Sequence, residues 1–118
     1  MDAYRNYSDQ ELCSLLKEGD RPAYIEIYSR YNSLLYLYAH KKLRNREEAK
    51  DVIQEVFIQL WKRHQQISFD TSLAGYLYQS VRNKALNIFA HQQIEQKYID
   101  SLNDFLSAPT AGTDYLIR

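Results

Sequence analysis

A chain of 118 residues, 45% hydrophobic and 25% charged, has room for one core and fits a single globular domain. Its formal net charge is zero, which argues against a uniformly basic surface of the kind that binds nucleic acid. The single cysteine, Cys13, excludes an intrachain disulfide, and neither a signal peptide nor an apolar run of membrane-spanning length is visible. We therefore expect a cytoplasmic protein without membrane insertion.

Two helices are predicted in the first third of the chain. The first runs from Ser8 to Gly19, and Ser8 and Glu11 form a capping box at its start. The second runs from Asp20 to about Asn45, with Pro22 in its first turn. Its apolar stripe is rich in tyrosine and consists of Tyr24, Ile27, Tyr28, Tyr31, Leu34, Leu35 and Tyr38. We interpret these tyrosines as packing residues with their hydroxyls at the edge of the core, rather than as base-stacking residues.

A third helix is predicted from a cap formed by Asn45 and Glu48 to about Arg63, and it contains the stretch DVIQEVFIQLW. At 100° per residue, one stripe holds Val52, Ile53, Val56 and Leu60. The opposite stripe holds Asp51, Gln54, Glu55 and Ile58. An apolar residue on an exposed stripe is most often a stray surface residue, and the alternative is a contact with a second molecule.

After a polar loop, HQQISFDTS, a fourth helix is predicted from about Ser72. Its apolar stripe consists of Leu73, Leu77, Val81, Ala85 and Ile88. Its polar face carries Tyr76, Gln79, Ser80, Asn83 and Asn87, flanked by Arg82. Beyond His91 the apolar pattern loosens but permits a further helix through Ile94, Tyr98, Ile99, Leu102, Phe105 and Leu106. The predicted fold is therefore all-α, a compact bundle of about four to five helices in residues 1–106, followed by a linker in 107–118.

The residues that catalysis or cofactor binding would need are not arranged for it. The three histidines lie far apart and no C-x-x-C pattern occurs, so we predict no metal site. Each glycine stands alone, which argues against a phosphate-binding loop. Glu47 and Glu48 fit the dipole of a helix start, and Cys13 has no nearby base to activate it. We predict a binding module that needs no cofactor, and not an enzyme.

The stretch DVIQEVFIQLW resembles the D-x-x-Q-E-x-F-x-x-x-W signature in the second conserved region of bacterial sigma factors of the extracytoplasmic-function (ECF) group. The matching residues are Asp51, Gln54, Glu55, Phe57 and Trp61. Farther on, SLAGYLYQSVRNKALNIF resembles the next block of that group, although Gly75 replaces a bulkier residue. GDRPAYIEIYSRY resembles the family's opening, so the resemblance covers roughly residues 9–93. Two blocks in the correct order are more specific than either alone.

In that family the second conserved region grips the clamp coiled coil of the largest subunit of core RNA polymerase. The resemblance therefore implies a polymerase-binding strip on the third helix, made of Asp51, Gln54, Glu55, Ile58 and Lys62. Phe57 and Trp61 lie at the edge of the apolar stripe, and we interpret both as core packing.

Sigma factors of this kind also capture a base flipped from the non-template strand of the promoter minus-ten element. The resemblance implies, by position, a DNA-binding set made of Phe69, Asp70, Thr71, Ser72, Tyr76, Gln79, Arg82, Asn83, Lys84 and Asn87. In this reading amides such as that of Asn83 bond bases, while Arg82 and Lys84 contact phosphates. The alternative for each polar residue is a solvated face.

The predicted function is thus that of a transcription initiation factor domain that binds core RNA polymerase and recognises and melts the minus-ten element. The alternative is a helical protein-interaction module without DNA activity, such as a fragment bound by an anti-sigma factor. A complete ECF factor has a second domain, a helix-turn-helix, and residues 107–118 are expected to begin the linker to it.

Overall fold

The computed structural model describes residues 2–68 and 72–107, and all regular structure in these ranges is helical, which confirms the all-α fold. The helices are α1 (Asp2–Asn6), α2 (Asp9–Lys17), α3 (Arg21–Leu43), α4 (Arg46–Lys62) and α5 (Leu73–Ser107). The chain divides into two compact units, Met1–Ala85 and Leu86–Arg118, and the boundary lies within α5. None of the helices in the described ranges combines the length and the hydropathy needed to span a membrane.

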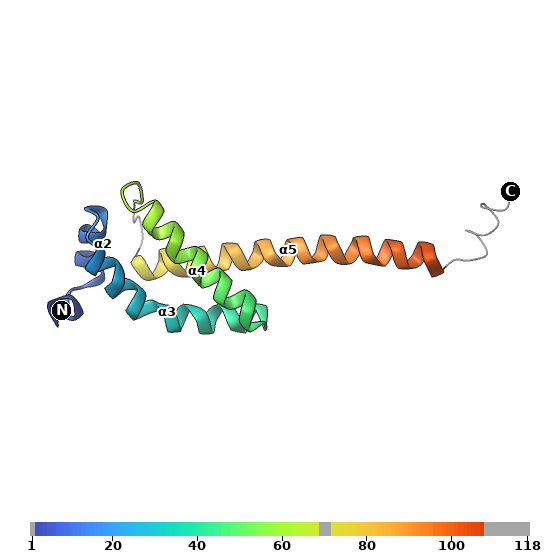
Figure 1. The fold of residues 1–118 in the computed structure, drawn as a ribbon, viewed down its shortest axis with the longest axis horizontal. Helices are drawn as coiled ribbons and strands as arrows, with labels where there is room; N and C mark the ends of the chain where they lie inside the picture. The colour runs from blue at the N-terminus through green and yellow to red at the C-terminus, as the bar shows by residue number, and fades with distance from the viewer. Residues whose placement is uncertain (1, 69–71, 108–118) are drawn as a thin grey trace. The chain divides into compact units, whose positions relative to one another are not determined.

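Local signals set the helix ends where the sequence predicted them. The Ser8 hydroxyl accepts from the backbone N–H of Glu11 at 3.1 Å, and the Glu11 carboxylate accepts from the Ser8 N–H at 2.9 Å. At the start of α4, the Asn45 side chain accepts from the N–H of Glu48 at 3.0 Å. α3 ends at Leu43, and the residue that follows it, Arg44, adopts the left-handed conformation with φ 53°. Only two residues then separate α3 from α4, so the two helices form a hairpin (Figure 1).

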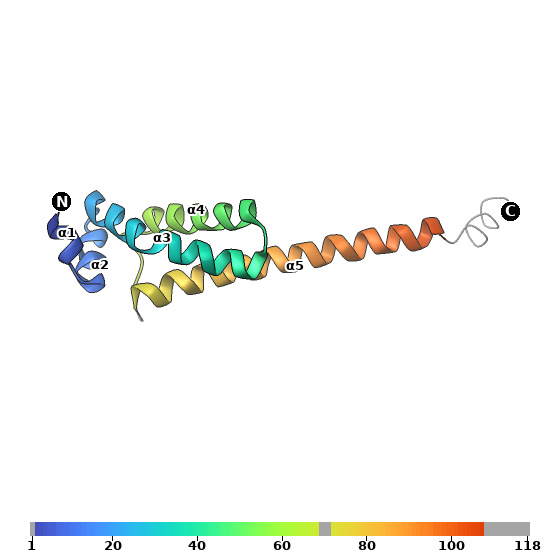
Figure 2. The same ribbon diagram turned by 90° about the horizontal axis from the view of Figure 1, so that it is seen from below.

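The core of the first unit is built around α3, which contacts α1, α2 and α4 (Figure 2). The buried residues of α3 are Ala23, Ile27, Leu35, Ala39 and Leu43. They recur at steps of four or eight, so the buried line winds around the helix along one ridge. The stripe predicted from the sequence is wrong at Leu34 and Tyr28, which are 51% and 46% exposed. Tyr28 follows Tyr24 by a step of four and Leu34 follows Tyr31 by a step of three, and neither position lies on the buried ridge.

Arg30 of α3 anchors the N-terminal helix, which sequence patterns did not predict. Its Nη2 donates to the carbonyl oxygens of Tyr4, Arg5 and Tyr7 at 3.0, 3.0 and 2.6 Å. Its Nη1 bonds Asp9 at 3.0 Å and its Nε bonds Glu26 at 2.9 Å. One guanidinium therefore satisfies the carbonyl oxygens at the end of α1 and ties them to α2 and α3.

The hydroxyl of Tyr31, one residue further along α3, also donates to Asp9. Burial, followed by this hydrogen bond, raises the pKa of Tyr31 to about 12. The hydroxyl therefore stays protonated, as a donor, at neutral pH. Tyr31 thus packs with its hydroxyl at the core boundary, as the sequence predicted for the tyrosines of this helix.

α5 begins at Leu73, and the hydroxyl of the preceding Ser72 accepts from the backbone N–H of Gly75 at 2.9 Å. Leu73, Leu77, Val81 and Ala85 of the predicted stripe are buried, whereas Ile88, its last member, belongs to the second unit and is half-buried. The fourth helix and the further helix expected from the sequence are one continuous helix to Ser107.

Replacing Arg30 by Ala should lower the free energy of unfolding by about 2 kcal/mol, because three backbone carbonyls and two carboxylates lose a charged donor. Arg30→Lys should recover less than half of this loss, since an ammonium group lacks the planar fork. Urea unfolding followed by circular dichroism measures both. Arg46→Ala, at an exposed position, should stay within about 0.5 kcal/mol of wild type, and equal losses for Arg30 and Arg46 would contradict the anchor.

Candidate functional site

The five residues predicted as the polymerase-binding strip, Asp51, Gln54, Glu55, Ile58 and Lys62, are all exposed along α4. Ile58 is 51% exposed, whereas Val52, Ile53, Val56 and Leu60 are buried. The structure therefore brings the strip together on one face and gives Ile58 a place among polar neighbours.

An aromatic cluster lies beside the strip and fixes α4 against α3. Phe57 is only 3% exposed, and its ring meets those of Tyr28 and Tyr24 edge-on, with centroids 4.8 and 6.4 Å apart. The Tyr24 hydroxyl donates to the carbonyl oxygen of Phe57 at 2.6 Å. Trp61 is half-buried, with its ring centroid 5.1 Å from that of Tyr24, and it stacks on His64 at 4.4 Å. Phe57 is thus a core residue, as predicted, while Trp61 remains partly open to solvent.

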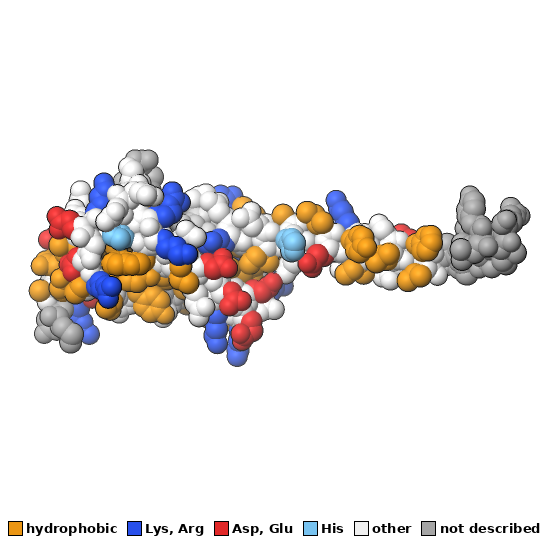
Figure 3. Space-filling model, turned by 45° about the horizontal axis from the view of Figure 1, so that its top comes forward, with side chains coloured by type: hydrophobic (Ala, Val, Ile, Leu, Met, Phe, Trp, Pro, Cys, Tyr) orange, Lys and Arg blue, Asp and Glu red, His pale blue; other side chains and the backbone are white. Residues whose placement is uncertain are grey.

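Trp61 and Ile58 line an apolar groove of about 390 Å³ between α3 and α4. The groove is formed by Arg21, Tyr24, Ile25, Ile58, Trp61 and Lys62. Ile25 is 64% exposed, and hydrophobic side chains gather on this face with basic side chains beside them (Figure 3). Ile25 was not predicted from the sequence as a contact residue, although, like Ile58, it is an isoleucine outside the predicted buried stripe of its helix. Only the pairing of α3 with α4 shows that Ile25 and Ile58 share one surface.

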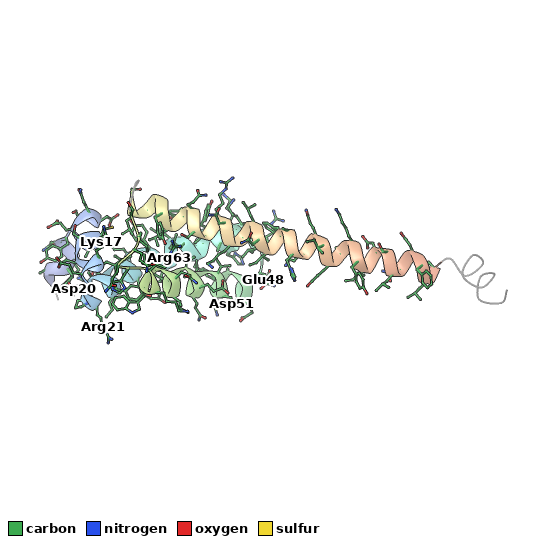
Figure 4. The ribbon with its side chains drawn as sticks, turned by 90° about the horizontal axis from the view of Figure 1, so that it is seen from above. Lys17, Asp20, Arg21, Glu48, Asp51 and Arg63 are labelled. Atoms are coloured by element: carbon green, nitrogen blue, oxygen red, sulfur yellow. The ribbon has the colours of Figure 1, made fainter. Side chains whose placement is uncertain are left out.

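Charges are segregated along the exposed face of α4. The acidic residues Glu47, Glu48, Asp51 and Glu55 lie in its first ten residues. Lys62 and Arg63 lie at its end, and Arg21 of α3 lies near that end, opposite to the end with Glu48 and Asp51 (Figure 4). This order suits the helix dipole, which favours carboxylates at the start of a helix and cations at its end. At the start of α4 four carboxylates outnumber the cations Arg46 and Lys50, so the face has a net negative end, an apolar centre and a positive end.

The residues predicted to contact DNA on α5 form a separate surface in the first unit. Gln79, Arg82 and Asn83 are exposed, and Tyr76 is half-buried. The Gln79 amide donates to the Asn83 side-chain oxygen at 3.1 Å, so the two amides are held one helical turn apart. Their remaining donors and acceptors are free to face a ligand.

Other members of the predicted DNA-binding set stand in different settings. Lys84 forms an ion pair with Glu55 of the strip, with Nζ and Oε2 3.3 Å apart, so two residues assigned to different partners contact each other. Ser72 caps α5, which is a structural role that the sequence reading did not assign to it. Asn87 is exposed and belongs to the second unit. Phe69, Asp70 and Thr71 lie outside the described residues.

Within residues 2–68 and 72–107, no group of three His, Cys, Asp or Glu side chains is placed to hold a metal ion. Burial, with the nearby charge of Asp9, raises the pKa of the Cys13 thiol to about 11. The thiol is thus overwhelmingly protonated at neutral pH, which makes it a poor nucleophile.

Comparison with known proteins gives two results. Residues 27–94, more than half of the chain, match the family model described as sigma-70 region 2. Over 101 residues the chain is 28% identical to the ECF RNA polymerase sigma factor SigW of Bacillus subtilis strain 168. That alignment covers 86% of this chain and 50% of the relative, so the chain spans about half the length of the protein it matches.

Ile58→Asp should change the free energy of unfolding by no more than about 1 kcal/mol, mainly through the lower helix propensity of Asp. Ile53 lies about one and a half turns before Ile58 and is only 6% exposed. Ile53→Ala should lower the free energy of unfolding by about 2–4 kcal/mol because it leaves a cavity. Thermal and urea unfolding of both variants measure the difference. A loss at Ile58 as large as that at Ile53 would mean that Ile58 is a core residue.

Proposed function

Since this chain belongs to the sigma-70 region 2 family, we propose that it is a transcription initiation factor domain that docks on core RNA polymerase and engages the promoter minus-ten element. This family is not a family of enzymes. The observation that carries the proposal is that all five residues of the polymerase-binding strip are exposed on one face of α4, beside an apolar groove. The proposal gives the strip and the groove one partner, and the α5 surface another.

The α4 face has the features of a docking site for a helix. An apolar anchor at the centre, ringed by polar residues, is the usual arrangement of a binding hot spot. Ile58 and Ile25 offer that apolar centre, and the rings of Tyr24 and Trp61 form the walls of the groove. A helix of the polymerase clamp would place one apolar side chain in the groove.

The charge order of the face sets the direction of that helix. A partner with basic residues over Asp51 and Glu55, and acidic residues over Arg21 and Lys62, would match it at both ends. The reverse orientation would bring like charges together, which costs binding energy and slows association. The strip therefore selects both the partner and its polarity.

We assign the second surface to single-stranded promoter DNA. The exposed amides of Gln79 and Asn83 suit hydrogen bonding to the edge of an unpaired base, and Arg82 suits a phosphate contact. Phe69, Asp70 and Thr71 directly precede Ser72 in the chain, and we propose that these residues complete the pocket for a flipped base. Tyr76, Lys84 and Asn87 are proposed as flanking contacts.

The ion pair between Lys84 and Glu55 connects the two proposed surfaces. A DNA phosphate near Lys84 would compete with the Glu55 carboxylate for the same ammonium group. Polymerase binding at Glu55 would compete from the other side. Occupation of one surface would then alter the charge presented by the other.

Calorimetric titration with the isolated clamp coiled coil tests the polymerase dock. We expect micromolar binding, about 8 kcal/mol, that weakens more than about tenfold in Gln54→Ala and in Ile58→Asp. Ile25→Asp should weaken binding similarly, although Ile25 lies outside the family signature, because it lines the same groove.

Gln93→Ala is the matched control, since it makes the same chemical change as Gln54→Ala at an exposed position outside the strip. It should bind like wild type. If all three variants, Gln54→Ala, Ile58→Asp and Ile25→Asp, bind the coiled coil as tightly as wild type, the α4 face is not the polymerase-binding surface.

Selection from a pool of random single-stranded oligonucleotides tests the DNA surface. With core polymerase present, wild type should enrich a short motif, and Asn83→Ala should lose at least one position of that motif because an amide contact to a base is removed. Arg82→Ala should keep the motif but reduce the salt dependence of binding by about one unit of slope.

Asn103→Ala, an exposed amide elsewhere on α5, should enrich the wild-type motif. If wild type binds polymerase but enriches no motif, the chain is a protein-interaction module without DNA activity, such as a domain held by an anti-sigma factor. That outcome would support the proposed polymerase-binding surface and contradict the proposed recognition of the promoter.

A further inference from the structure

The second half of α3 and the beginning of α5 contain cations but no carboxylates. Residues 27–46 and residues 72–94 have no Asp or Glu, although the whole chain has equal numbers of acidic and basic residues. Exposed cations in these stretches include Lys41, Lys42 and Arg82. In the described part of the chain, none of these three forms an ion pair. Their charge is therefore available to an anionic partner.

A pair of tyrosines joins the two helices beside these cations. The rings of Tyr38 on α3 and Tyr78 on α5 meet edge-on, with centroids 5.0 Å apart. The Nζ atom of Lys42 lies 5.0 Å from the centroid of the Tyr38 ring, in a cation–π contact that restrains the lysine side chain. Arg82 follows Tyr78 by four residues, as Lys42 follows Tyr38. Each cation therefore lies one helical turn beyond its tyrosine, on the same side of its helix.

The two helices run in the same direction, which places these cations at one level of the bundle. Figures 1 and 2 both show the second half of α3 beside the beginning of α5, with the chain direction the same in each. Lys42 and Arg82 are thus both one turn beyond the contact between the tyrosines, and Lys41 is next to Lys42 in the chain. We call Tyr38, Lys41, Lys42, Tyr78 and Arg82 the α3–α5 basic patch. A patch with three cations and no carboxylate favours a partner with several closely spaced negative charges.

We propose that the α3–α5 basic patch binds backbone phosphates of the same DNA strand whose base faces Gln79 and Asn83. This inference rests on the function proposed above. At 100° per residue, Arg82 lies about 40° from Tyr78 on one side and about 60° from Gln79 on the other. Arg82 therefore borders both surfaces. A strand that places a base at the amides carries its next phosphates across Arg82 toward Lys42.

The chemistry of the patch suits a nucleic-acid backbone. Proteins hold single strands with cations that follow the backbone and with aromatic rings placed among them. Phosphate contacts of this kind add affinity without reading the sequence. The ring of Tyr38 already restrains Lys42, so less side-chain freedom is lost when a phosphate binds there. The patch thus supplies affinity, while the amides supply the choice of base.

An acidic protein helix is the other class of partner that would suit three unpaired cations. Leu34 and Leu37, which are 51% and 63% exposed, would offer such a helix apolar contacts on α3. On the α5 side, however, none of the large apolar residues from Leu73 to Ala85 is exposed. The patch instead continues through Arg82 into the polar amide surface, and DNA is therefore the better fit.

Fluorescence anisotropy of the chain with core polymerase tests the proposal, using two labelled single strands of equal length. One strand carries the motif enriched in the selection described above, and the other is oligothymidylate, which reports on the patch even if no motif is enriched. Between about 50 and about 200 mM NaCl, Lys41→Gln and Lys42→Gln should each reduce the slope of log K against log salt by about 0.7 for both strands. The double variant should bind both strands several-fold more weakly than wild type. Lys17→Gln, the same change at an exposed position on α2, should match wild type.

The outcomes separate this inference from the proposed function. If the lysine variants bind both strands as wild type does, while Asn83→Ala still weakens binding of the motif strand, the phosphate contacts are wrong and the promoter role stands. If the lysine variants weaken binding of both strands and Asn83→Ala weakens neither, the phosphate contacts are supported and the proposed base reading is wrong. Equal displacement of both strands by an oligoglutamate peptide of the same charge would assign the patch to acidic proteins and overturn the inference.

Discussion

The packing of Tyr24 of α3 against Phe57 of α4 is the contact on which the proposed docking surface depends. The Tyr24 hydroxyl bonds the backbone of α4 at Phe57, and the Phe57 ring lies against the tyrosines of α3. This contact fixes the rotation of α4 about its own axis. Val56 and Leu60 then face inward while Ile58 faces outward, and Ile25 arrives next to Ile58. The groove is therefore a consequence of core packing and is already formed without a partner.

Features set by neighbours in the sequence could be predicted, and features set by distant residues could not. The caps at Ser8 and Asn45, and the inward face of α4, follow from residues within one or two turns. α1 has only five residues and no such signal, because it depends on Arg30, more than twenty positions away. Leu34 was misplaced for a related reason, since the crossing of helices decided which ridge of α3 is buried.

The same division holds for the candidate sites. Periodicity alone showed that Ile58 stands on a polar face, but the groove needed Ile25 from another helix. The family signature proposed Glu55 and Lys84 as contacts of different partners, and their ion pair across 29 positions appears only in three dimensions. Ser72 shows a further limit, since a residue chosen for its polar side chain also caps a helix. A motif therefore identifies a surface more reliably than it assigns roles within it.

Two exposed apolar surfaces, the groove and the side chains of residues 94–106, differ in what supports them, and this difference bears on how each would bind. The groove is backed by the buried side chains of α3 and α4, so a partner loses little free energy in ordering it. None of the residues from Ala90 to Ser107 is buried, and a helix without packing is only marginally stable in water. Binding at this second surface would thus be coupled to helix formation. Such coupling subtracts the free energy of ordering the helix from the free energy of binding, whereas a preformed groove carries no such cost.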